Sequence, residues 1–175
     1  RLFTLIDAPE SLVDMVLARL LRSQPQTIDG RSVPASEPPL IRLTDLLTVT
    51  GFDAAVLERI EPYVAVIPTE RGKPPATLVN LNTAPAEVIA AMLPNLDLAV
   101  ARRFVARRER TFFKDLAEAT LQIDGSPVLP PTLLSVGSSY FLLRGMVRFD
   151  RVEVASETLL VRSGGNIDIV WQPRL

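Results

Sequence analysis

The stretch Leu78-Val-Asn-Leu-Asn-Thr-Ala-Pro-Ala-Glu87 is the most ordered local signal in the sequence, and it decides the fold of the middle of the chain. Thr83 is the expected N-cap, because its hydroxyl can accept a hydrogen bond from the first helical turn. Pro85 suits that first turn, where a missing N–H costs nothing. Glu87 places negative charge near the positive end of the helix dipole. The stretch therefore predicts an extended lead-in followed by a helix.

Helical signals continue on the C-terminal side of this stretch. Asn80 and Asn82 are expected to satisfy backbone groups ahead of the Thr83 cap. Asp97 is expected to cap a second helix that ends near Arg108, and a third, short helix is expected over residues 115–120. Apolar residues recur at helical spacing in the first two helices: Val88, Ile89, Met92, Leu93, Val100, Phe104 and Val105.

The N-terminal part of the chain repeats this pattern in a weaker form. Asp7-Ala-Pro-Glu10 resembles a capping box, so a helix is expected from about Ala8 to Arg22. Residues 23–39 lack apolar periodicity and carry four prolines, which predicts a mobile surface loop. Residues 43–67 predict a second helical hairpin, in which Gly51 ends one short helix and Asp53 caps the next. A charged, proline-rich turn is expected over residues 69–75.

The C-terminal part changes from helical to strand periodicity. Residues 140–149, 152–162 and 167–172 are rich in β-branched and aromatic side chains and predict three strands. Turn residues separate them, which indicates an antiparallel meander that needs a helix or further strands to pack on. The sequence thus predicts an α+β fold with three parts. These are a first helical unit over 1–77, a second over 78–134, and C-terminal antiparallel strands over 135–175.

Composition excludes several classes of function. The 175 residues include 19 Lys and Arg against 20 Asp and Glu, a net charge of −1 that provides no general field for nucleic acid or anionic membranes. Histidine and cysteine are both absent, which excludes Ser-His-Asp and Cys-His nucleophiles, imidazole or thiolate zinc sites, and disulfides. The chain starts at Arg1 and has no apolar run long enough to span a bilayer, so we expect a fragment of a longer protein.

The central motif resembles a known family. The run from Val79 to Glu87, followed by Leu93-Pro94, Ala101-Arg102 and residues 107–113, is similar to the general secretion pathway protein K family. That family is the largest minor pseudopilin of type II secretion systems. The resemblance extends from about Thr44 onward and includes the late Ser139-Tyr140-Phe141.

The resemblance implies both a fold and a role. It implies two sterile-alpha-motif-like (SAM-like) helical units inserted into a pilin-type α/β domain, whose membrane-anchoring N-terminal helix is absent here. It also implies a place at the tip of the periplasmic pseudopilus, bound to the minor pseudopilins I and J, with H linking them to the major pseudopilin. Such a subunit would initiate or cap the filament, support protein export and catalyse no reaction.

One family feature is not evident in this sequence. Many members carry an acidic segment after the first helix whose carboxylates are plausible calcium ligands. The matching region here, residues 20–29, holds one acidic residue. Calcium favours six to eight oxygen ligands with several carboxylates, so neither a calcium site nor any other cofactor is expected.

Two other classes of function are weighed against this interpretation. A helix-hairpin-helix DNA-binding module, as in DNA-uptake proteins, is the main alternative. Its hairpins use small residues where backbone N–H groups meet phosphate, whereas Asp97 would repel phosphate here. Residues 51–119 also carry nine basic and nine acidic side chains. An enzyme would need more than a carboxylate pair such as Asp115 and Glu118.

Several side chains are candidates for partner binding, each with a structural alternative. Arg102, Arg103 and Arg107 belong to an arginine-rich helix that is either a binding surface or a solvated face paired with nearby acids, and the second is favoured. Phe112 is either an exposed anchor or, as favoured, an aromatic that locks its loop onto the core together with Phe113. Trp171 is left open between sheet core and interface anchor.

Overall fold

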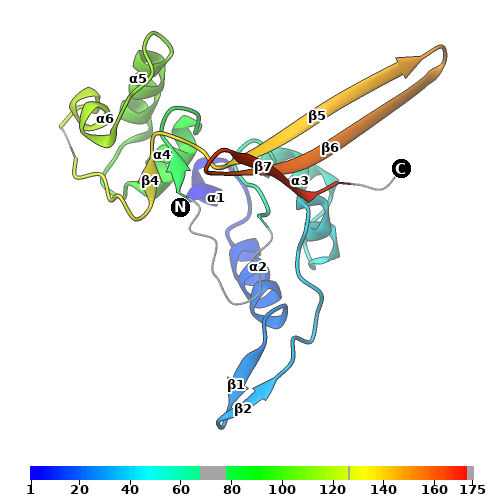
Figure 1. Ribbon diagram of the computed structural model, residues 1–175. Helices are drawn as coiled ribbons and strands as arrows, with labels where there is room; N and C mark the ends of the chain where they lie inside the picture. The colour runs from blue at the N-terminus through cyan, green and yellow to red at the C-terminus, as the bar shows by residue number, and fades with distance from the viewer. Residues whose placement is uncertain (68–77, 126, 173–175) are drawn as a thin grey trace.

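The computed structural model describes residues 1–67, 78–125 and 127–172. The helices precede a separate three-stranded antiparallel sheet, so the fold is α+β as predicted. Figure 1 shows two groups of helices, with the long β5–β6 ribbon extending away from both. The turn predicted over residues 69–75 lies outside the described residues, beside the expected boundary between the helical units.

The first helical group contains α1 (Leu2–Leu5), α2 (Ser11–Arg22), the 3-10 helix η1 (Leu43–Thr48) and α3 (Ala54–Ile60). Asp53 caps α3 as predicted, because its Oδ1 accepts from the N–H of Val56 at 2.8 Å. Gly51 has a φ of +88°, and a Cβ there would lie 2.8 Å from the Leu12 side chain. Only glycine therefore fits this turn. The buried residues of the group are Ile6, Ala8, Leu12, Leu40, Leu46, Val49, Phe52 and Ile60.

The predicted start of the first long helix is wrong. Helix α2 begins at Ser11, and no side chain caps it. Asp7 lies in the left-handed region with a φ of 54° and cannot form the expected capping box. Its carbonyl accepts a hydrogen bond from Arg59, while the carboxylate of Glu10 accepts from the Thr4 hydroxyl. Contacts with other segments thus replace the local cap.

The loop predicted over residues 23–39 contains ordered structure. Strands β1 (Gln26–Ile28) and β2 (Arg31–Val33) pair as an antiparallel hairpin. Asp29 and Gly30 form its two-residue turn with φ values of 49° and 74°, the conformation that Asp-Gly favours. The prolines alone indicate a loop, whereas the Asp29-Gly30 pair is the sequence signal for this hairpin turn.

The second helical group lies between two short parallel strands, β3 (Val79–Asn80) and β4 (Leu134–Ser135). It contains α4 (Ala86–Met92), α5 (Leu98–Arg108) and α6 (Leu116–Gln122). Helices α5 and α6 begin where predicted, capped by Asp97 and Asp115. Phe104 is fully buried and stacks on Phe113 with ring centroids 4.9 Å apart. The other large side chains that are fully buried in this core are Leu81, Ile89, Ile123 and Leu134.

Helix α1 connects the two helical groups. Leu5 packs against the core of the second group, while its neighbour Ile6 belongs to the core of the first. The Arg1 guanidinium donates to the carbonyls of Leu93 at 3.0 Å and Leu96 at 2.7 Å. The two groups are therefore held together at the start of the chain.

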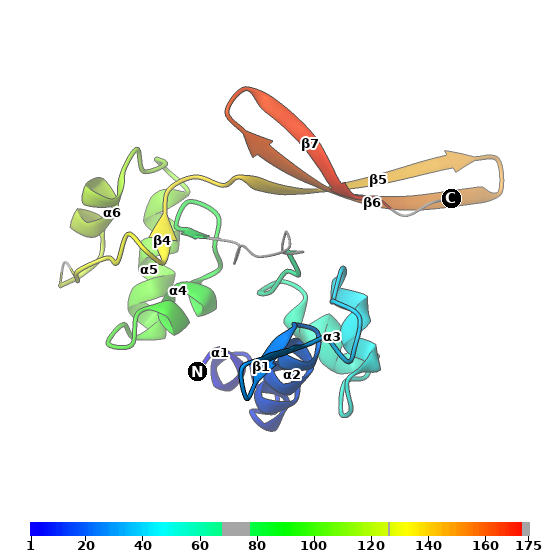
Figure 2. The ribbon, with the colours of Figure 1, turned by 60° about the horizontal axis from the view of Figure 1, so that its bottom comes forward.

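The sheet contains β5 (Tyr140–Phe149), β6 (Val152–Ser163) and β7 (Asn166–Trp171) in that order. These bounds confirm the predicted meander. Strands β5 and β6 pair without interruption from Tyr140↔Val161 to Phe149↔Val152, and β7 pairs with β6 across an irregularity at Leu159/Leu160. Figure 2 shows the ribbon reaching beyond the helices. None of the described helices has the length and hydropathy needed to cross a bilayer.

Candidate functional site

Asn82 is the centre of the motif that opens the second helical group. Its Nδ2 donates to the carbonyls of Phe113 at 2.8 Å and Val136 at 2.9 Å. Its Oδ1 accepts from the N–H of Phe113 at 2.8 Å. One amide thus joins the lead-in to α4, the loop before α6 and the segment that leads to the sheet.

Asn80 shapes the turn that leads into α4. Its Oδ1 accepts from the N–H of Asn82, and its Nδ2 donates to the Ser138 hydroxyl, each at 2.9 Å. Its carbonyl accepts from the N–H groups of Thr83 at 3.1 Å and Ala84 at 2.8 Å. Asn80 therefore organises the turn through both its side chain and its backbone.

Thr83 is not the helix cap that the sequence predicted. Helix α4 begins at Ala86 with Pro85 at its N-cap position and no side-chain cap, while Glu87 lies in its first turn. The Thr83 hydroxyl instead donates to the Asn80 carbonyl oxygen at 3.5 Å. The turn held by Asn80 places the helix start two residues later than a Thr83 cap requires.

Arg108 also holds this turn, a role that its neighbours in the sequence do not indicate. Its guanidinium donates to the carbonyls of Leu81 at 2.7 Å and Ala84. Partial burial lowers the pKa of Arg108, although Glu109 acts in the opposite direction. Arg108 is 27 residues from Leu81 in the chain, so no local pattern indicates this contact.

The other arginines of α5 form ion pairs within the chain. Arg102 lies 3.3 Å from Glu87, and both Arg103 and Arg107 lie 2.9 Å from Asp124. Hydrogen bonds from Arg103 and Arg107 lower the pKa of Asp124. These arginine side chains remain partly exposed, but neighbouring acidic side chains balance their charge.

Phe112 and Phe113 have opposite environments. Phe113 is buried against Phe104 as expected. Phe112 is 67% exposed, so the expectation that it packs onto the core is wrong. The buried carbonyl and N–H of Phe113 are bound by Asn82, which leaves the preceding side chain directed to solvent. Phe112 is thus an accessible aromatic on the second helical group.

Trp171 ends β7 and contacts the first helical group. It pairs with Leu159 of β6, and the Arg42 guanidinium lies 5.3 Å from its ring centroid. Its Nε1 is buried without an acceptor among the residues that the structure describes. Arg144 of β5 makes a second link between the sheet and the first helical group, because it pairs with Glu61 after α3. Arg144 also pairs with Glu157 of β6 at 2.8 Å.

The two faces of the β5–β6 ribbon differ in charge. One face carries Arg144 and Arg148 opposite Glu157 and Glu153. The other face has no charged residue between Phe141 and Phe149 on β5 or their partners on β6, and we call it the open face. Its exposed apolar residues are Phe141, Leu143, Val147, Phe149, Val152 and Val154.

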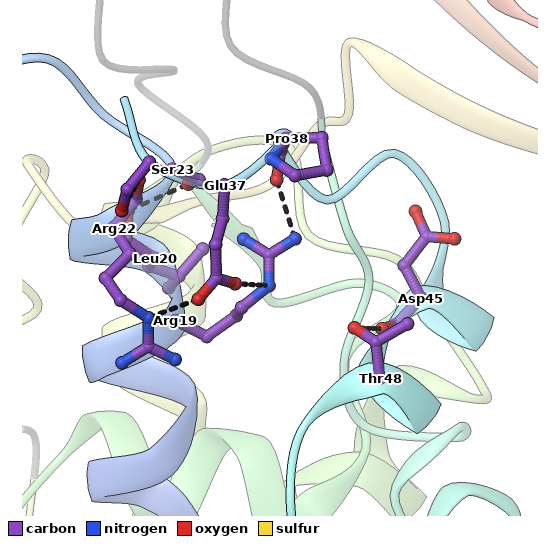
Figure 3. A network of polar contacts seen from close by, with 9 residues as sticks. Arg19, Leu20, Arg22, Ser23, Glu37, Pro38, Asp45 and Thr48 are labelled. Carbon is purple, nitrogen blue, oxygen red and sulfur yellow. Dashed lines mark hydrogen bonds and ion pairs between the residues drawn. The ribbon is translucent and has the colours of Figure 1, made fainter. Parts of the chain in front are cut away.

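A polar network at the end of α2 holds the segment that follows the β1–β2 hairpin (Figure 3). The Arg19 residue is only 5% exposed, and its guanidinium pairs with Glu37 at 2.7 Å and donates to the Pro38 carbonyl at 2.6 Å. Arg22 pairs with the other oxygen of Glu37. The Arg22 carbonyl accepts from the N–H groups of Ser36 and Glu37. Because Arg19 and Glu37 lie on either side of the hairpin in the chain, no local sequence pattern indicates this network.

Comparisons with known proteins agree on one family. Residues 79–137 match the sequence model of the family described as type II secretion system (T2SS), protein K. Type II secretion system protein K of Aeromonas hydrophila is 28% identical over 134 residues. That alignment covers 73% of this chain but 39% of the relative, so the chain spans less than half of that protein's length.

A solved structure shares the fold. A chain in the crystal structure of the GspK–GspI–GspJ complex from the type 2 secretion system of enterotoxigenic Escherichia coli matches with a TM-score of 0.68 at 22% identity. The match covers 98% of this chain and 66% of that chain. The family match includes the Asn80–Asn82 turn, helices α4 to α6 and strand β4. Through these residues, the chain is similar to the type II secretion system protein K family.

Proposed function

We propose that this chain is the periplasmic part of a minor pseudopilin that helps to initiate and cap a type II secretion pseudopilus. The observation that carries this proposal is the agreement between the family match over residues 79–137 and the fold shared along 98% of the chain with a member of the GspK–GspI–GspJ complex. Its work is contact with other subunits, which supports export of proteins across the outer membrane.

The proposed partners are I-like and J-like minor pseudopilins, with an H-like subunit joining them to the major pseudopilin. The open face is a contiguous apolar surface, and a surface of this kind marks a site that another segment or subunit covers. We assign the open face to a pilin-type domain, where an N-terminal helix of the same protein covers it. The helical groups then remain accessible beyond that domain.

The proposed role is non-catalytic and does not involve nucleic acid. Asp97 caps α5 with its own carboxylate, which occupies the N–H of Ala99 at 2.6 Å and places negative charge where a phosphate would have to bind. The arginines of α5 are paired with Glu87 and Asp124, which further reduces their availability to a DNA backbone.

Co-purification tests the proposed function directly. A tagged chain comprising residues 1–175 is expressed with the soluble domains of the I-like and J-like pseudopilins from the same operon. A stable complex that survives gel filtration is expected. The absence of a complex, together with tight DNA binding in a gel shift at physiological salt, would overturn the proposal and favour the DNA-binding alternative.

Variants can test the five candidate contact residues within the same assay. Phe112→Ala removes an exposed aromatic, whereas Arg102→Gln, Arg103→Gln and Arg107→Gln remove charges that are already paired within the chain. We expect Phe112→Ala to weaken the complex more than any of these arginine variants, because exposed aromatics are typical binding hot spots. Trp171→Phe keeps a smaller aromatic ring but removes the indole N–H, and tests whether that group binds a partner.

A further inference from the structure

Oxygen atoms converge on the guanidinium of Arg19 at the end of α2. The Glu37 carboxylate and the Pro38 carbonyl approach it from two sides, as Figure 3 shows. Carboxylate and carbonyl oxygens are also the groups that bind calcium in proteins. The segment is the one in which the family resemblance implies calcium ligands, so the fit of its residues to a metal ion can be tested.

The carboxylates of this region do not fit a calcium site. Glu37 is shared between Arg19 and Arg22, and its two oxygens each face a guanidinium. Asp45 on the neighbouring η1 accepts from the N–H groups of Ile41 at 2.7 Å and Arg42 at 2.9 Å. Asp29 lies in the turn of the β1–β2 hairpin. In the described ranges no three acidic side chains are grouped as metal ligands.

We propose that the Arg19 guanidinium is the built-in cation of this region and closes the segment between α2 and Leu40 without calcium. It lies between the helix and the returning chain, where it contacts the Glu37 carboxylate and the Pro38 carbonyl. It neutralises Glu37 and fixes the backbone at Pro38, while the Arg22 carbonyl fixes the backbone at Ser36 and Glu37. The β1–β2 hairpin therefore projects from a base that is closed by the chain's own side chains.

Burial makes the Arg19 contacts stronger than those of a surface ion pair. Charged groups that are withdrawn from water interact more strongly, but each becomes costly when its partner is removed. The Arg19 side chain is 6% exposed, against 49% for that of Arg22. We therefore expect Arg19 to dominate the closure and Arg22 to assist it.

Calcium dependence of the native chain is the first test, and it is independent of the proposed function in assembly. Thermal unfolding and tryptic cleavage after Arg31, in the hairpin, are measured in EGTA and in millimolar calcium chloride. Both the unfolding temperature and the cleavage rate are expected to stay unchanged. A rise in unfolding temperature or a slower cleavage upon calcium addition would overturn the proposal.

Glu37→Gln is the second test, since it removes the shared carboxylate and preserves every tryptic site. Cleavage after Arg31 should accelerate by about ten-fold, because the buried Arg19 charge loses its partner, which promotes local opening. Calcium should not restore the native rate. Asp14→Asn makes the same change of charge at an exposed position of α2 and should leave the rate unchanged. A native cleavage rate in Glu37→Gln would overturn the proposal.

Discussion

The second helical group buries its large apolar side chains, whereas the three-stranded sheet leaves most of its own exposed. In the helical group Phe104, Leu81, Ile89 and Leu134 are fully buried, and α4, α5 and α6 close around them. Among the described residues of the sheet only Thr158 and Leu159 are buried, and neither helical core includes a sheet residue. A similar apolar content thus produces a closed core in one region and an open surface in the other.

This difference separates stability from assembly. The helical group supplies its own packing and should respond to core substitutions as a small domain does. The sheet has hydrogen-bonded strands, but most apolar residues of its open face are exposed in the described part of the chain, so they are available for contact with another segment or subunit. Substitutions in the two regions should therefore affect different measurements.

Phe104→Ala should have the largest effect on stability. It removes a fully buried ring that stacks on Phe113, and large-to-small changes of this type cost about 3–5 kcal/mol of unfolding free energy. Urea denaturation followed by circular dichroism measures this cost. Phe112→Ala is the matched control, because its exposed ring should change stability by less than about 0.5 kcal/mol. Equal losses in the two variants would contradict the assignment of the core.

Asn82→Ala should have the next largest effect. It leaves the N–H and carbonyl of Phe113 and the carbonyl of Val136 without their partner, which costs about 1–3 kcal/mol. Thr83→Ala should change stability by less than about 0.5 kcal/mol, because Thr83 caps no helix. Parallel urea melts of the two variants compare them, and a larger loss in Thr83→Ala would restore the capping role predicted from sequence.

Much of the fold was predictable wherever local chemistry decides it. Asp53, Asp97 and Asp115 each accept from a backbone N–H two or three residues ahead, so a short window of sequence contains the whole interaction. The three strands were also predictable, because β-branched runs and turn residues alternate within a few residues. These elements begin and end within a few residues of the predicted positions.

The failures occur where distant segments replace local partners. Asp7 has an acceptable capping sequence, yet its contacts with Arg59 hold it in a left-handed turn. Thr83 has good capping chemistry, but the bonds of Asn80 and Arg108 determine the turn before α4. The Arg19–Glu37 pair likewise joins residues on either side of a hairpin. Neither spacing nor propensity in one sequence reports such pairings.

Arg144→Gln should produce a smaller effect, on the orientation of the sheet. Arg144 links the ribbon to Glu61 after α3, but surface pairs contribute only about 0–1 kcal/mol. The chain has no cysteine, so spin labels can be attached selectively to two cysteines introduced by Ala55→Cys and Arg151→Cys. The distance distribution between the labels should broaden in Arg144→Gln. Arg148→Gln, further along the same face, should leave it unchanged, and equal distributions in all three chains would exclude the link.

Phe149→Ser should have the smallest effect on stability and a clear effect on surface hydrophobicity. Phe149 is 81% exposed on the open face, so its removal should change the unfolding free energy by less than about 0.5 kcal/mol. Fluorescence of the dye ANS in the presence of the folded chain should decrease, because an accessible apolar group is lost. A large loss of stability would show that the open face is part of a core.

The parallel pairing of β3 and β4 places the entrance and exit of the second helical group next to each other. The Val79 N–H donates to the Leu133 carbonyl, and the Leu81 N–H donates to the Ser135 carbonyl, each at 2.8 Å. Segments whose two ends lie close together are tolerated as insertions, because the flanking parts of the chain are separated by only a short distance. Evolution can therefore enlarge, exchange or remove this module while the strands that follow it keep their place.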